Sequence, residues 1–142
     1  MAESERNDRP EVERFRRVRE AHQTELAEDY VELIGDLIAE TGEARVVDLA
    51  ERLGVSSATV NNAIQRLQRD GLVTSKPYRA IFLTERGQEM AAQARERHRL
   101  VVELLMALGV DPATAEVDAE GIEHHVSDAT LAAFRTFLEK PR

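Results

Sequence analysis

Apolar residues recur at three- and four-residue intervals along most of this chain, and this spacing constrains the fold more than any other feature. Aromatic residues make up only 4% of the 142 residues and Trp is absent, so the core must consist mainly of aliphatic side chains. Such a composition favours packed helices over an antiparallel sandwich. The predicted helices are Glu11–Glu40, ended by Gly42; Val47–Leu53; a segment capped by Ser56 and ended by Asp70; a segment capped by Thr84 and closed by Gly109; one that begins after Asp111; and one capped by Ser127.

Two short runs typical of strands, Leu72–Thr74 and Ala80–Leu83, interrupt the helical pattern. The residues between them predict a β-hairpin. The two helices before the hairpin join at Gly54 and Val55, a turn that is typical of a helix-turn-helix. The sequence therefore predicts a mainly α fold with a winged helix-turn-helix over residues 11–83, an all-helical domain over 84–142, and a disordered tail over residues 1–10.

The charge is divided unevenly along the chain. The formal net charge is −8, yet residues 44–82 carry six basic against three acidic side chains. This basic segment suits nucleic acid, and the acidic segments on either side suit cations. No cysteine is present, which excludes disulfides and thiolate metal ligands. No apolar run approaches the ~18 residues of a membrane span, so we expect a cytoplasmic protein without membrane contact.

Small polar side chains gather on the exposed side of the second helix of the predicted helix-turn-helix. Asn and Gln can donate and accept hydrogen bonds together, as adenine recognition in the major groove requires. Basic side chains in the hairpin suit phosphate or minor-groove contacts. An ordinary helical hairpin with solvated polar residues is the alternative. The candidate DNA-binding residues are Ser57, Thr59, Asn61, Asn62, Gln65 and Arg66 in the helix and Lys76 and Arg79 in the hairpin.

Acidic and histidine side chains in separate segments form a candidate metal site. Asp29 and Glu32 share one helix face, and His98 interrupts an apolar helix stripe. Converging carboxylates ~4 Å apart repel by ~4 kcal/mol at an effective dielectric near 20, and a cation removes that repulsion. Taken alone, Asp29 and Glu32 also fit a solvated helix face, and His98 also fits a hydrogen-bonded histidine of the core. The third segment, Glu-Gly-Ile-Glu-His-His, contributes Glu120, Glu123 and His124.

Several motifs in register between residues 22 and 138 resemble the manganese transport regulator branch of the diphtheria toxin repressor family, in its short form. They are Glu-Asp-Tyr-Val-Glu-Leu-Ile, Gly-Glu-Ala-Arg-Val, Leu-Gly-Val-Ser, Tyr-Arg, Glu-Arg-His and Glu-Gly-Ile-Glu-His-His. The resemblance implies a homodimer that binds operator DNA when loaded with one or two Mn²⁺ ions per subunit and represses manganese uptake genes. The implied ligands are Asp29, Glu32, His98, Glu120, Glu123 and His124.

Iron-responsive relatives have Met at the position of Asp29, and a hard carboxylate there favours Mn²⁺. The chain departs from the family at Asn62, where Lys is frequent, and in a longer helical extension before Leu26. His22 in that extension is either a surface residue or an additional ligand.

Three other interpretations stay open at this point. The first is an Fe²⁺-responsive repressor of the same architecture. The second is a regulator gated by an organic ligand, which leaves the acidic cluster unexplained. The third is a metalloenzyme, which is disfavoured because four carboxylates and two imidazoles would saturate the ion, whereas catalysis needs an open coordination position. We therefore expect no enzymatic activity and no small organic substrate.

Overall fold

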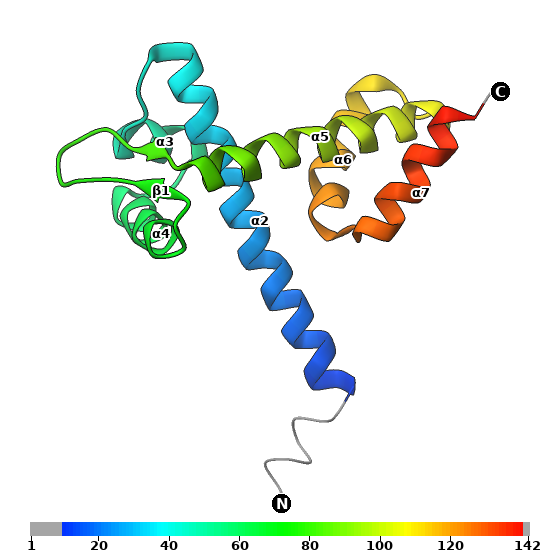
Figure 1. The fold of residues 1–142 in the computed structure, drawn as a ribbon, viewed down its shortest axis with the longest axis horizontal. Coiled ribbons are helices and arrows are strands. Elements are labelled where there is room, and N and C mark those ends of the chain that lie inside the picture. Colours follow the sequence, from blue (N-terminus) through cyan, green and yellow to red (C-terminus); the bar gives the residue numbers. More distant parts are fainter. Residues whose placement is uncertain (1–9, 141–142) are drawn as a thin grey trace, which may run out of the picture.

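The computed structural model describes residues 10–140 and consists mainly of helices with one antiparallel hairpin (Figure 1). Residues 1–9 of the predicted tail lie outside the described residues, and Pro10 already belongs to the first helix. The elements are α2 (Pro10–Thr41), α3 (Val46–Leu53), α4 (Ser57–Arg69), β1 (Val73–Thr74), β2 (Phe82–Leu83), α5 (Glu85–Ala107), α6 (Pro112–Ile122), the 3-10 helix η1 (Glu123–His125) and α7 (Asp128–Glu139). This arrangement confirms the predicted mainly α fold.

Side-chain caps begin several helices where the sequence predicted them. In each case the capping oxygen accepts a hydrogen bond from the backbone N–H three residues later, which satisfies a donor that the first helical turn leaves unpaired. The caps are Ser56 of α4, Thr84 of α5, Asp111 of α6 and Ser127 of α7. Gly54 adopts the left-handed conformation (φ 67°) that ends α3, as a tight helix-turn-helix connection requires.

The second half of α2 belongs to the hydrophobic core of the winged helix-turn-helix. Its buried residues pack with those of α3, α4 and the hairpin, and the hairpin itself pairs Val73 with Leu83 and Thr74 with Phe82. A bridge between Ala44 and Ile81 adds the segment after α2 to this sheet. A displacement of α2 therefore moves the whole winged helix-turn-helix. The α2 contribution consists of Tyr30, Val31, Ile34 and Leu37.

A further core lies where the second half of α5 packs against α6 and α7, around Val101, Ala115 and Leu131. The α5 helix contributes to both cores and forms the connection between the lobes in Figure 1. The predicted division between residues 83 and 84 stays a prediction. Among residues 10–140 no helix is both long and apolar enough to cross a membrane.

Some apolar residues of the helical pattern lie outside these cores. Leu108, the apolar residue that follows the last turn of α5, is 64% exposed. The first half of α2 extends away from the rest of the chain (Figure 1), and Phe15 there is 56% exposed. The apolar spacing thus predicted the α2 helix, which is unbroken, but not which of its residues are buried.

Gly87 in the first turn of α5 is required by close packing, which gives a stability prediction. A Cβ atom at this position would overlap the backbone carbonyl oxygen of Leu72, which cannot move aside as a side chain would. We expect Gly87→Ala to lower the free energy of unfolding by about 1–3 kcal/mol, as overpacking commonly does. Urea unfolding measures the change. Gly121→Ala is the control, because a Cβ there meets open space and favours the helix; equal stability of both variants would contradict the prediction.

Candidate metal centre and DNA-binding surface

Ionisable side chains from three parts of the chain meet where α2 crosses α5 and η1. The α2 helix carries Asp29 and Glu32 one turn apart, the α5 helix carries His98, and the end of α6 with η1 carries Glu120, Glu123 and His124. The η1 segment contacts both α2 and α5. The fold therefore brings together residues that are up to 95 positions apart in the sequence.

His98 and the two glutamates of the α6–η1 segment form one group of potential metal ligands. Nδ1 of His98 lies 2.6 Å from Oε2 of Glu123 and 3.6 Å from Oε1 of Glu120. Ligand atoms of all three residues lie within 4.8 Å of one another. Glu123 is only 1% exposed, which is unusual for a carboxylate and requires compensation by hydrogen bonds or positive charge.

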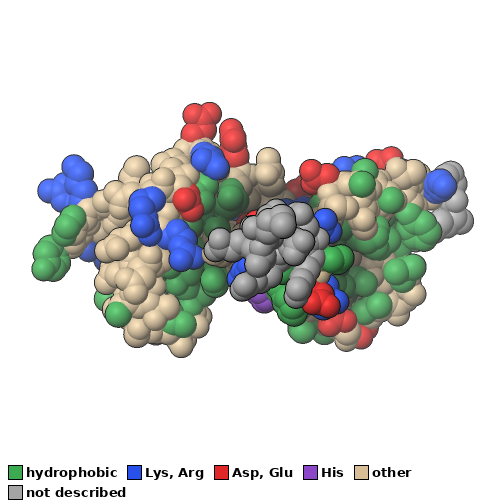
Figure 2. Space-filling view, turned by 90° about the horizontal axis from the view of Figure 1, so that it is seen from below, with side chains coloured by type: hydrophobic (Ala, Val, Ile, Leu, Met, Phe, Trp, Pro, Cys, Tyr) green, Lys and Arg blue, Asp and Glu red, His purple; other side chains and the backbone are tan. Residues whose placement is uncertain are grey.

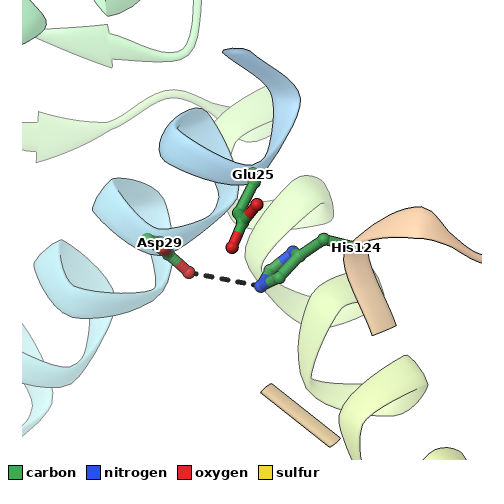
Figure 3. A group of neighbouring side chains, drawn as sticks. All are labelled: Glu25, Asp29 and His124. Carbon is green, nitrogen blue, oxygen red and sulfur yellow. Dashed lines mark ion pairs between the residues drawn. The ribbon is translucent and has the colours of Figure 1, made fainter. Parts of the chain in front are cut away.

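His124 forms a neighbouring group with Asp29 and Glu25 (Figure 3). Its Nε2 lies 3.4 Å from Oδ1 of Asp29 and 3.3 Å from Oε1 of Glu123. Glu123 thus directs one oxygen to His98 and the other to His124. A carboxylate in this position can bridge two cations.

Glu32 completes the acidic cluster on α2. Burial, followed by the charges of Glu123, Glu120 and Asp29, raises the pKa of Glu32 to about 7. Burial also raises the pKa of Asp29, against the opposing charge of His124. Burial is the larger cause of both shifts, and the convergence of carboxylates that the sequence analysis expected adds to it.

Each histidine of the cluster is oriented by a carboxylate on its far side. Nδ1 of His124 lies 2.6 Å from Oε2 of the buried Glu28, whose Oε1 lies 2.5 Å from Arg97. When Nδ1 of His124 donates this hydrogen bond, Nε2 carries the lone pair that can coordinate a metal. Nε2 of His98 lies 2.6 Å from Glu116 in the same way, which leaves Nδ1 directed toward the other acids. Such carboxylate–imidazole pairs are common behind metal ligands.

These carboxylates also affect histidine protonation. Burial alone would lower the pKa of His124, but its hydrogen bond to Glu28 and the nearby acids raise the pKa above the ordinary value. The pKa of His98 is raised likewise by Glu116 and Glu123, against the effect of burial. A protonated imidazole cannot coordinate a metal, so protonation of either ring would compete with cation binding.

The sequence analysis selected the six residues at the centre of this cluster but missed those around it. Glu25 and Glu116 each lie one helical turn before a predicted ligand, and this spacing was a usable signal. Glu28 is adjacent to Asp29 in the sequence, but it contacts Nδ1 of His124, whereas Asp29 lies near Nε2. Nothing in the local sequence distinguishes Arg97, whose partner Glu28 is distant in the chain.

The predicted DNA-contact residues lie on a different part of the molecule. Those of α4 and the hairpin are all exposed, and Thr59 also hydrogen-bonds the capping Ser56 at 3.0 Å. Between α4 and the hairpin lies an open groove of about 670 Å³. Figure 2 shows several Lys and Arg side chains on this lobe. The groove is lined by Arg45, Asn61, Gln65, Lys76, Tyr78 and Arg79, of which the sequence analysis missed Arg45 and Tyr78.

A winged helix-turn-helix joined to a helical unit rich in carboxylate and imidazole groups defines a metal-responsive, DNA-binding transcriptional regulator. Two family models match almost the whole chain: "Iron dependent repressor, N-terminal DNA binding domain" over residues 22–81, and "Iron dependent repressor, metal binding and dimerisation domain" over residues 84–142. The chain belongs to the iron dependent repressor family.

Similar proteins carry consistent names. The chain is 55% identical to the transcriptional regulator MntR of Escherichia coli O157:H7, over 94% of this chain and 86% of that protein. It is 41% identical to the HTH-type transcriptional regulator MntR of Listeria monocytogenes serotype 4a, over 73% of each chain.

Solved structures share the fold. A "Manganese-dependent transcriptional repressor complex with manganese" is 34% identical with a TM-score of 0.69, and the match covers 81% of this chain and 53% of that one. The manganese regulator SloR is 29% identical with a TM-score of 0.68, over 81% and 54% of the two chains. The chain thus spans about half the length of these solved proteins.

The raised pKa of Glu32 gives a prediction for the metal-free protein. A folded-state pKa above the ordinary 4.5 means that the folded chain binds more protons between pH 4.5 and about 7. The free energy of unfolding should therefore fall as the pH rises through this range. Urea unfolding in a chelator at pH 5 and pH 8 measures the difference, and Glu32→Gln should reduce it.

The matched control for this experiment is Glu89→Gln, an exposed glutamate of α5. It should keep the wild-type pH dependence. An unchanged pH dependence in Glu32→Gln would show that Glu32 ionises in the folded protein as it does in the unfolded one.

Proposed function

We propose that this protein is a Mn²⁺-dependent transcriptional repressor that binds operator DNA as a homodimer and controls manganese uptake genes. Relatives that are 55% and 57% identical to it over the aligned 94% and 91% of this chain are named as MntR regulators, and a structural neighbour is a manganese-dependent repressor in complex with manganese. The architecture supports regulation rather than catalysis.

The observation that carries this proposal is the donor set at the crossing of α2, α5 and η1. Oxygen-rich ligand sets suit Mn²⁺, and imidazole adds borderline donors that this ion accepts. When bound, a divalent cation supplies the positive charge that the converging carboxylates lack. We propose that Glu123 would help to hold a cation beside His98 and a cation beside His124, because its two oxygens lie near these two rings. The proposed ligands are Asp29, Glu32, His98, Glu120, Glu123 and His124.

Cation binding can affect the DNA-binding unit because α2 belongs to both the acidic cluster and the core of the winged helix-turn-helix. Asp29 and Glu32 lie on the turns that carry Tyr30, Val31 and Ile34 into the core of the DNA-binding unit. Repulsion between these acids and Glu120 and Glu123 favours separation of α2 from η1, and its removal favours the close arrangement. The orientation of α4 relative to the α5–α7 unit then depends on charge neutralisation at the cluster.

In this account α4 enters a major groove of DNA. We propose base-edge contacts from Asn61, Asn62 and Gln65, with phosphate contacts from the hairpin. In a homodimer two such helices would read half-sites about one helical turn or a multiple apart. The proposed DNA-binding residues are Ser57, Thr59, Asn61, Asn62, Gln65, Arg66, Lys76 and Arg79.

DNA binding as a function of Mn²⁺ tests the proposal. The probe is a duplex selected from a random pool in the presence of Mn²⁺, and fluorescence anisotropy measures its affinity. We expect Mn²⁺ to tighten binding by about 5- to 150-fold, the usual range of allosteric coupling. His98→Ala and Glu120→Ala should lose this response, because each removes a proposed ligand.

Asp118→Ala is the control, since Asp118 is an exposed acid of the same helix as Glu120. It should respond to Mn²⁺ like the wild type. Equal affinity with Mn²⁺ and with a chelator, or failure to select any duplex, would reject the proposal. A tighter complex with Fe²⁺ than with Mn²⁺ at buffered cellular concentrations would replace Mn²⁺ by Fe²⁺ as the signal.

A further inference from the structure

The tip of the hairpin carries a tyrosine in a backbone conformation that usually belongs to glycine. The φ of Tyr78 is 61°, and among residues 10–140 it is the only residue other than Gly with a positive φ. In this region the Cβ atom of an L-residue crowds the backbone carbonyl oxygen, which costs free energy. Residues held in such conformations are concentrated at functional sites. The strain therefore makes Tyr78 a candidate functional residue.

Residues 76–79 form the turn in which this strain arises. The backbone N–H of Arg79 donates a hydrogen bond to the carbonyl oxygen of Lys76, 3.1 Å away. Pro77 fixes a negative φ at the second position of the turn, and the positive φ follows at the third, so the turn is of type II. This third position favours Gly. The chain thus has an aromatic residue where turn chemistry alone would select Gly.

Packing within the chain does not compensate for the strain. Tyr78 is 101% exposed, so its ring gains nothing from burial in either hydrophobic core. The connection between β1 and β2 projects from the lobe that carries α3 and α4 (Figure 1). A tyrosine ring in this position can gain contact area only from another molecule.

The surroundings of Tyr78 indicate that this molecule is DNA. Tyr78 lines the same groove as Asn61 and Gln65 of α4, which are proposed to contact base edges. Lys76 and Arg79 of the same turn are both exposed. A phenol between two cations suits the backbone of a nucleic acid, because the hydroxyl can donate to a phosphate oxygen while the ring packs against the sugar.

We propose that Tyr78 contacts the sugar–phosphate backbone of the operator and thereby positions α4 in the adjacent groove. The proposal rests on the proposed function, because it requires DNA as the ligand. The contact is to the backbone, so it adds affinity for any duplex and carries no base preference. The side chain is neutral, so unlike the cations of the hairpin it displaces no counterions from the DNA.

A purely structural role in the turn is the alternative explanation. In that case Tyr78 would act only by placing Lys76 and Arg79. Its replacement would then change the number of phosphates that are neutralised, and with it the salt dependence of binding. Direct contact by a neutral side chain predicts lower affinity at an unchanged salt dependence.

Fluorescence anisotropy at several salt concentrations, with the duplex selected in the presence of Mn²⁺, tests the proposal. We expect Tyr78→Gly to weaken binding about tenfold, as expected for the loss of one hydrogen bond to a charged group, and to keep the wild-type salt dependence. Tyr78→Phe keeps the ring and should lose less. Lys76→Ala, the charged comparison, should reduce the slope of log affinity against log salt by about one.

Two further measurements separate DNA contact from damage to the fold. Gly relieves the positive φ, so the urea midpoint of Tyr78→Gly should equal or exceed that of the wild type. An unrelated duplex should lose affinity by the same factor as the selected one, because the contact carries no base preference. Gln93→Ala, which removes an exposed neutral side chain of α5, should keep the wild-type affinity.

Wild-type affinity in Tyr78→Gly would overturn the proposal, and so would a loss confined to the selected duplex or a reduced salt slope. The Mn²⁺ response is measured in the same variants and should keep its wild-type size, because Tyr78 lies on the hairpin and not in the acidic cluster. A wild type whose DNA binding ignores Mn²⁺ would instead reject the proposed function, so the two failures are distinguishable.

Discussion

The carboxylate of Glu123 is held almost without solvent between His98 and His124, with one oxygen toward each ring. Removing a carboxylate from water is costly unless hydrogen bonds or opposite charge replace the lost hydration. The α2 helix adds Asp29 and Glu32 to the same region, so that negative charge exceeds what two imidazoles can balance. The close approach of α2 to η1 therefore depends on how this charge is neutralised.

The positions of the two hydrophobic cores explain how charge neutralisation at the cluster can affect DNA binding. Tyr30, Val31, Ile34 and Leu37 embed α2 in the winged helix-turn-helix, while Asp29 and Glu32 of the same helix belong to the acidic cluster beside η1. The basic groove beside α4 lies on the lobe remote from α6 and α7 (Figure 1). Acidic and basic functions are thus separated in space but joined by the α2 helix. No contact between metal ligands and DNA is required for coupling of this kind.

Helix starts and the acidic and histidine side chains at the centre of the cluster could be predicted from the sequence because both follow from local spacing. Ser56, Thr84, Asp111 and Ser127 begin helices by capping the residue three positions on. The ion pair behind the His124 ring could not be predicted, because it depends on tertiary contacts. Arg97 reaches Glu28 across two helices, and the burial of α2 side chains depends on where η1 and α5 lie. Phe15 shows the limit most clearly, since its apolar spacing is helical although no described element covers it.

Amide hydrogen exchange of the full chain with and without Mn²⁺ tests the central claim most directly. The claim is that neutralising the cluster holds α2 against η1, and slowed exchange reports such local closing. We predict that Mn²⁺ slows exchange in residues 22–34 and 118–126 together, with little change at the tip of the hairpin. Binding of Mn²⁺ without added protection in either segment would contradict the account.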